Sequence, residues 1–177
     1  MFIDLLRQRR SVRKFLDKPV EREKVNELVE AALRSPSSRG LNPWQFIIVD
    51  DKALLETLSA SKEHGSTFLK GAPFAIIVCA DDSIETWIED CSIASILIQL
   101  SAEALGLKSC WIQIRDRQHD RLTTAREFVA EHVKLPANLN IEAIIAIGYP
   151  DEKKQPHKLE KLQFDKIWFN TYGQPMQ

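Results

Sequence analysis

The stretch DCSIASILIQLSAEALGLKSCWI, residues 90–112, decides the fold of this chain. Its first part belongs to a long helix that we predict over residues 84–105, because apolar side chains recur on several of its sides. A helix that is apolar nearly all round must be covered nearly all round, and in a chain of 177 residues a partner subunit is a natural cover. Gly106 stands in the C′ position that ends such a helix, and we predict a strand over residues 109–114. The apolar residues of the helix are Ile93, Ala94, Ile96, Leu97, Leu100, Ala104 and Leu105.

Helices and strands alternate on both sides of this stretch. Residues 21–34 carry one apolar stripe at helical spacing, which predicts a second helix. The alternation indicates an α/β pattern with mostly buried strands. Further helices are expected at 2–9, 53–61 and 123–132, and strands at 44–49, 74–79 and 141–147. From residue 151 the chain is polar, yet it carries bulky apolar residues that have little reason to be there unless they dock somewhere. These are Ile167, Trp168, Phe169 and Tyr172.

The composition is that of an ordinary globular protein of one domain. It is 44% hydrophobic, and its 24 basic and 25 acidic residues leave a net charge of −1. A balanced chain has no overall field to attract DNA or an anionic membrane, so we expect neither as a partner. The longest apolar run, Phe74–Ala80, is far shorter than the ~20 residues that a membrane span needs. The N-terminus lacks the order of a secretory signal, and we expect a cytoplasmic protein.

Two kinds of site are disfavoured. Cys79, Cys91 and Cys110 are widely spaced, without a Cys-x-x-Cys pair, so we expect buried free thiols and no structural zinc or other metal site. No G-x-G-x-x-G follows the first strand, and no G-x-x-x-x-G-K-[ST] occurs, which disfavours a Rossmann dinucleotide site and a P-loop.

The first candidate for chemistry is the basic turn, residues 9–14, with the sequence RRSVRK. Three guanidinium groups and a hydroxyl can make several charge-assisted hydrogen bonds to one phosphate, because the planar fork of Arg pairs with two oxygens at once. Taken alone, this cluster is more simply explained as a solvated basic turn or as a weak nucleic-acid patch.

The second candidate is the serine loop, residues 36–44, with the sequence PSSRGLNPW. Two prolines stiffen it, and two serines and an asparagine offer uncharged donors and acceptors, a composition that suits the polar edge of a flat heterocycle. An ordinary helix-to-strand loop is the alternative. Together, a phosphate clamp and a rigid polar loop are what a phosphorylated ring cofactor needs.

Five strings of this chain resemble the nitroreductase family in order and spacing, over about residues 5–150. They are RRSVRKF (9–15), SPSSRGLNPWQFIIVDD (35–51), GAPFAIIVCA (71–80), the opening stretch (90–112) and AIIAIGYP (143–150). The resemblance implies an α+β fold, in which helices flank a mixed sheet, in an intertwined homodimer with FMN at the interface. It implies an FMN-binding domain over residues 1–150 and a C-terminal arm, residues 151–177, that packs on the partner subunit.

The resemblance also implies the cofactor contacts. Arg9, Arg10 and Ser11 would hold the phosphate, and Arg13 would lie near the pyrimidine edge, where a positive charge stabilises the anionic reduced ring. Pro36, Ser37 and Ser38 would line the ring from the partner subunit, and Asn42 would face the cofactor region. The segment Ile112, Gln113 and Ile114 would offer a backbone N–H to the flavin N5, and Gly148 would allow close backbone approach.

The chain departs from the family pattern at several of these positions. Gly40 and Asn42 stand where many relatives have Asn and Gln, and Gln113 stands where many have Gly. Relatives often carry a basic pair in the tail that completes the phosphate site, for which Lys158 and Lys161 are the candidates here.

The reaction that the resemblance implies needs no catalytic side chain. NAD(P)H would pass hydride to N5, and a nitroaromatic or a quinone would then take two electrons in the same cleft, by ping-pong kinetics. Other flavin chemistry on the same fold, namely dehalogenation, enoate reduction or flavin fragmentation, stays open. So do a non-catalytic flavin-binding module and a nucleic-acid-binding protein that uses the basic turn.

Overall fold

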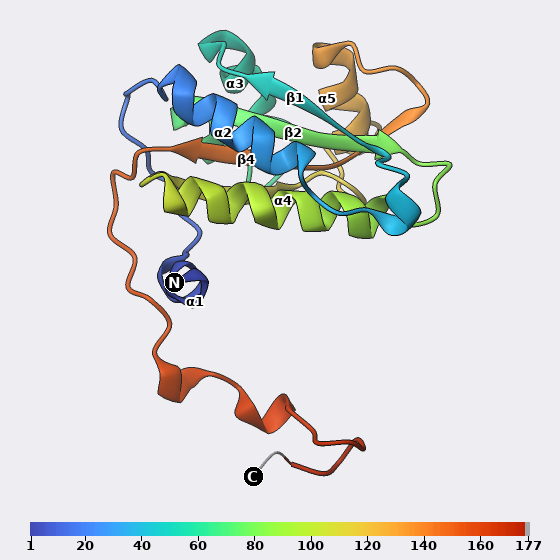
Figure 1. The fold of residues 1–177 in the computed structure, drawn as a ribbon. Helices are drawn as coiled ribbons and strands as arrows, with labels where there is room; N and C mark the ends of the chain where they lie inside the picture. Colours follow the sequence, from blue (N-terminus) through green and yellow to red (C-terminus); the bar gives the residue numbers. More distant parts are fainter. Residues whose placement is uncertain (176–177) are drawn as a thin grey trace.

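The computed structural model describes residues 1–175 and contains every helix and strand predicted above (Figure 1). The helices are α1 (Phe2–Gln8), α2 (Arg22–Leu33), α3 (Lys52–Leu58), α4 (Trp87–Ala104) and α5 (Ala125–Val133). The strands are β1 (Trp44–Val49), β2 (Phe74–Asp81), β3 (Lys108–Gln113) and β4 (Leu139–Gly148). The largest changes are at the start of α4, which begins at Trp87 after a turn, and at the end of α3, which ends at Leu58.

The four strands form one sheet in the order β1-β2-β4-β3, and every neighbouring pair is antiparallel. The α+β class is confirmed, but the expected mixed sheet is wrong for the described residues. β1 ends at Val49 and β2 begins at Phe74, and Val49 pairs with Ala75. The chain therefore enters β2 at the same end of the sheet at which it left β1. A parallel neighbour would need a connection that crosses the whole sheet, and the helix between these strands, α3, has only 7 residues.

Between β2 and β3, the helix α4 crosses the length of the sheet. Its 18 residues correspond to about 27 Å, and they carry the chain from the end of β2 to the start of β3. These two strands run in the same direction, but β4 lies between them and pairs antiparallel with both. The inserted strand is why alternating helices and strands produce an antiparallel sheet here.

Helices cover both faces of the sheet (Figure 1). α2 and α4 pack on one face, where Leu28, Trp87 and Ile98 lie in one core, and α3 and α5 cover the other, where Leu55 and Val129 lie in a second core. β2 and β4 are central and buried on both faces, which explains their unbroken apolar runs. β1 and β3 are the two edge strands.

Several apolar surfaces remain uncovered. α1 has no buried residue, and α4 exposes Ile93 and Ile96. The C-terminal arm leaves the end of β4 and runs away from the body of the molecule (Figure 1), and all its described residues from Lys153 onward are exposed. Within residues 1–175, no helix combines the length and the apolar character needed to cross a membrane.

Candidate functional site

The basic turn lies beside the first residues of edge strand β3. Ser11 forms an isolated parallel bridge with Ser109, and the Val12 N–H donates to the Ser109 carbonyl at 3.1 Å. Val12 and Phe15 are buried in the core. These two apolar anchors hold the turn against the sheet and leave the residues between and before them at the surface.

The thiol of Cys110 on β3 is buried beside the basic turn. Burial raises the pKa of this thiol, while the charge of Arg13, a side-chain hydrogen bond with Ser11 and the charges of Lys62 and Arg9 oppose the rise. The structure keeps Arg9, Ser11 and Arg13 together in this turn, and their contact with a cofactor stays a prediction. The structure adds Lys62, which the sequence analysis missed because it lies about fifty residues away in the chain.

The start of the C-terminal arm contacts the same turn. The Arg10 guanidinium donates to the Gln155 carbonyl, and the Arg13 N–H donates to Glu152 Oε1 at 2.7 Å. This bond from Arg13, with a second from Lys154, lowers the pKa of Glu152. The arm is thus tied to the basic turn before it leaves the molecule.

The chemistry of these donors fits a phosphate. Within residues 1–175, none of the guanidinium groups of Arg9, Arg10 and Arg13 forms an ion pair with a carboxylate. Three cations and a hydroxyl without a local acidic partner leave their hydrogen-bonding capacity for an external anion. The phosphate of FMN is such an anion.

At the other end of β3 lie Ile112, Gln113 and Ile114, which were predicted to offer a backbone N–H to the cofactor. One of them, Gln113, faces the free edge of the strand. The backbone of Ser109 faces away from β4, since its carbonyl accepts from Val12. By the alternation of an antiparallel strand, the N–H of Gln113 faces the free edge too. The Ile114 N–H donates to the Glu142 carbonyl of β4 at 3.1 Å, and the side chains of Ile112 and Ile114 are fully buried. Of this segment, Gln113 is the residue that can reach a cofactor.

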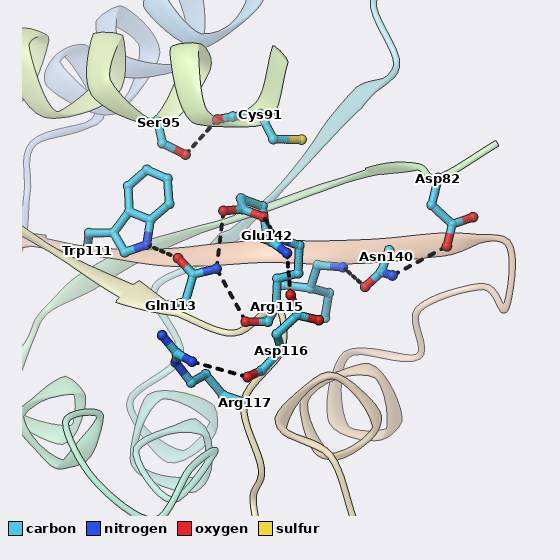
Figure 2. Close-up of polar contacts among 11 residues, drawn as sticks. Asp82, Cys91, Ser95, Trp111, Gln113, Arg115, Asp116, Arg117, Asn140 and Glu142 are labelled. Carbon is cyan, nitrogen blue, oxygen red and sulfur yellow. Dashed lines mark hydrogen bonds and ion pairs between the residues drawn. The ribbon is translucent and has the colours of Figure 1, made fainter. Parts of the chain in front are cut away.

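A buried hydrogen-bond network holds Gln113 in place (Figure 2). Its amide oxygen accepts from the Trp111 indole at 2.8 Å, and its amide nitrogen donates to Glu142 Oε1 at 3.2 Å. Arg115 Nε donates to the other Glu142 oxygen at 2.8 Å. Glu142 is only 3% exposed, and it is the lone acidic residue inside the apolar run of β4. That isolated charge was the available sequence signal for a buried ion pair, which the analysis missed.

The serine loop closes on itself. Ser37 Oγ accepts from the Asn42 N–H at 2.9 Å and donates to Asn42 Oδ1 at 2.7 Å, and the Ser38 N–H donates to Asp90 of α4 at 2.9 Å. Asp90 is 2% exposed and was also missed by the sequence analysis. Three residues of the loop have left-handed φ angles: Arg39, Gly40 and Asn42. These contacts, together with the two prolines, restrain the loop.

One chain does not bring the basic turn and the serine loop together. The turn lies at the start of edge strand β3, and the loop precedes β1, the opposite edge strand, at the other end of the sheet. Spacings of about 4.8 Å between strands and about 3.3 Å per residue put the two roughly 20 Å apart. The tail lysines also stay separate: among the described residues, neither Lys158 nor Lys161 contacts the basic turn, and Lys158 Nζ lies 3.8 Å from Glu160 Oε1.

Gly148 is packed closely against other residues of the same chain. A Cβ at this position would lie 2.7 Å from Cδ of Pro73 and 3.1 Å from Cδ1 of Phe15. Packing inside the chain therefore accounts for the glycine, and its predicted contact with the cofactor has no support from its surroundings.

Replacing Gly148 by Ala is expected to destabilise the fold by about 1–3 kcal/mol, because the rigid Pro73 ring must move to admit the methyl group. Gly71→Ala is the matched control, since a Cβ there meets nothing within 4 Å. Urea unfolding measures both. Equal stability of the two variants would mean that the packing at Gly148 is looser than described.

Comparison with known proteins gives consistent matches. The model of the nitroreductase family matches residues 6–63 and 55–149. The solved structure of an FMN-dependent nitroreductase from Clostridium difficile R20291 superposes with a TM-score of 0.94 at 46% identity, covering 96% of this chain and 99% of that one. An NADH dehydrogenase of Thermus thermophilus is 25% identical over 199 residues, covering 91% of this chain and 92% of its own. An iodotyrosine deiodinase of Thermotoga neapolitana is 26% identical over 197 residues, covering 97% and 99%.

Proposed function

Since this chain belongs to the nitroreductase family and is an FMN-dependent oxidoreductase, we propose that it passes two electrons from NAD(P)H to a small planar acceptor such as a nitroaromatic or a quinone. The observation that carries the proposal is the basic turn beside the free edge of β3, whose guanidinium groups form no ion pair with a carboxylate of the described residues. The outward N–H of Gln113 lies further along the same edge.

The residues of this edge have separate tasks in the proposed reaction. Arg9, Arg10 and Ser11 bind the phosphate, and Arg13 supplies positive charge to the pyrimidine edge of the ring. The N–H of Gln113 donates to the ring near N5, and the network around Glu142 keeps that N–H in position. Bound FMN supplies the two-electron chemistry itself, so no side chain has to act as a nucleophile.

We propose a homodimer, because the parts of the site lie far apart in one chain. A serine loop supplied by a second copy can meet the basic turn, whereas the loop of the same chain lies on the opposite edge of the sheet. α4 leaves Ile93 and Ile96 exposed, although an apolar helix face is normally covered. A two-fold interface over this helix would cover both copies at once.

The C-terminal arm supports the same assembly. Its apolar residues Phe164, Trp168 and Phe169 are exposed in the single chain. A mostly apolar groove between α2 and the free edge of β1 offers a place for the arm of a second copy, and it is lined by Val29, Leu33, Trp44, Phe46 and Ile48, among others. The Trp44 indole N–H at this groove is buried and has no hydrogen-bond partner within residues 1–175.

A direct experiment tests the proposal. The purified protein is expected to be yellow, to release FMN on heating, and to oxidise NADH or NADPH with a quinone or a nitroaromatic, giving the parallel double-reciprocal lines of ping-pong kinetics. A colourless monomer that refuses added FMN would contradict the proposal.

Reductive dehalogenation is the second candidate, because the similarity to the iodotyrosine deiodinase spans almost the whole chain. Its signature would be a bound flavin that neither nicotinamide reduces, together with turnover of a halogenated aromatic when a chemical reductant is supplied. The same assay panel separates the two activities.

A further inference from the structure

Two loops on the α3 and α5 side of the sheet meet next to the basic turn. The carbonyl of Ala60 lies 2.8 Å from Nδ1 of His119, so the segment after α3 is held against the loop that follows β3. Lys62 lies two residues beyond Ala60, and Arg117 lies two residues before His119. Figure 2 shows the Arg117 side chain on the opposite side of the strand end from α4.

Lys62 and Arg117 are close enough to repel each other. Burial lowers the pKa of the Lys62 ammonium, and the charge of Arg117 lowers it further. The guanidinium carbon of Arg13 lies 5.8 Å from the centre of the Phe68 ring, so the segment after α3 also lies beside the basic turn, and the charges of Lys62, Arg9 and Arg13 all oppose the rise in the pKa of the Cys110 thiol. Four cations therefore face one region from three segments of the chain.

The acidic residues of these loops have other partners. Glu63 lies 3.8 Å from His64, Asp116 pairs with Arg115, and Asp120 accepts backbone N–H groups within its own turn. In the part of the chain that the structure describes, Lys62 and Arg117 form no ion pair with a carboxylate. Two like charges held together without an acid have a net repulsion that a bound anion would relieve.

We propose that Lys62 and Arg117 form an anion subsite that binds the pyrophosphate of the nicotinamide dinucleotide. The inference rests on the proposed function. FMN brings one phosphate, and the basic turn already offers two guanidinium groups, Arg9 and Arg10, and the Ser11 hydroxyl for it. Lys62 is only half-buried and Arg117 is exposed, so these two cations stay reachable from solvent, which suits a substrate that comes and goes rather than a resident cofactor.

The test compares Lys62→Gln, Arg117→Gln and the double variant with the unaltered FMN-loaded protein. Arg121→Gln is the matched control, because it removes one charge from the same loop. The double variant is expected to raise the KM for NADH and NADPH about tenfold, the loss of roughly two partly exposed charge-assisted contacts. N-benzyl-1,4-dihydronicotinamide, a hydride donor without phosphate, is expected to react at an unchanged rate.

Two binding measurements complete the test without turnover. Calorimetry is expected to show that ADP-ribose, which carries the pyrophosphate but no hydride, binds the double variant about tenfold more weakly. Fluorescence titration of the apoprotein is expected to show an unchanged Kd for FMN. Single variants are expected to fall between the double variant and the control.

Three results would overturn the inference. The first is an equal loss of activity with the phosphate-free donor. The second is a weakened affinity for FMN, which would assign the cations to the resident cofactor. The third is that the Lys62 and Arg117 variants behave like Arg121→Gln with every ligand. Any of these can occur while the unaltered protein still binds FMN and oxidises NADH. Failure of the proposed function itself is distinct, because the unaltered protein would then neither hold FMN nor react with either donor.

Discussion

Arg10→Ala and Arg13→Ala are each expected to raise the Kd for FMN by about 10- to 100-fold, since a charge-assisted contact to phosphate or to an anionic ring edge contributes about 1.5–3 kcal/mol. Both guanidinium groups stand in the basic turn without an acidic partner among the described residues, so their charge is free to act on the cofactor. Quenching of FMN fluorescence on titration with apoprotein measures the change.

Lys14→Ala is the control for these variants, because it removes one positive charge from the same turn without touching the predicted contacts. It is expected to leave the FMN affinity nearly unchanged. The Arg10 guanidinium also holds the Gln155 carbonyl, so the oligomeric state of Arg10→Ala must be measured alongside. Full retention of FMN by both arginine variants would show that the basic turn is not the phosphate site.

Removing residues 156–177 is expected to have the second large effect: a monomeric protein that no longer retains FMN. The described residues of this segment are all exposed and belong to neither core, so the rest of the chain is expected to fold without it. FMN is expected to be lost because the proposed site needs two chains. In a single chain, the spacings between strands and along them keep the basic turn and the serine loop roughly 20 Å apart. Light scattering and the visible absorbance of the purified protein measure both outcomes.

A milder version of this experiment keeps the chain length. Trp168→Ala combined with Phe169→Ala removes two large apolar groups from the arm and is expected to weaken the dimer, whereas Lys166→Ala changes an exposed charge nearby and is expected not to. A truncated protein that remains a yellow dimer would show that the arm has no part in the assembly. A truncated protein that fails to fold would show that the arm supports the core.

Local patterns predicted most of the elements. The apolar stripe of α2 and the short apolar runs of β1 and β2 each depend on residues a few positions apart, and the structure confirms all three. The basic turn could be recognised for the same reason, since its three arginines are nearly consecutive. In such a segment, the order of the residues is enough to predict the local geometry.

The direction of the strands could not be read in this way. The alternation of helices and strands left the strand directions open and the family resemblance implied a mixed sheet, but β4 inserts between β2 and β3 and pairs antiparallel with both, and β1 pairs antiparallel with β2. Which strand enters a sheet, and where, depends on the packing of the whole chain. A short helix such as α3 cannot span the length of the sheet, so the chain enters the next strand at the end of the sheet where it left the previous one. In the sequence, only the length of this helix indicated that return.

By itself the sequence determined the class of each element, the buried strands, the positive charge of the basic turn and the family resemblance. Only the tertiary structure decided the pairing of the sheet, the role of Glu142 and Asp90 as internal supports, and the convergence of Lys62 and Arg117 on the basic turn. The physical reason is range. Helical and strand periodicity act over a few residues, whereas the meeting of charges from residues 9, 62 and 117 depends on how three distant segments fold onto the same edge of one sheet.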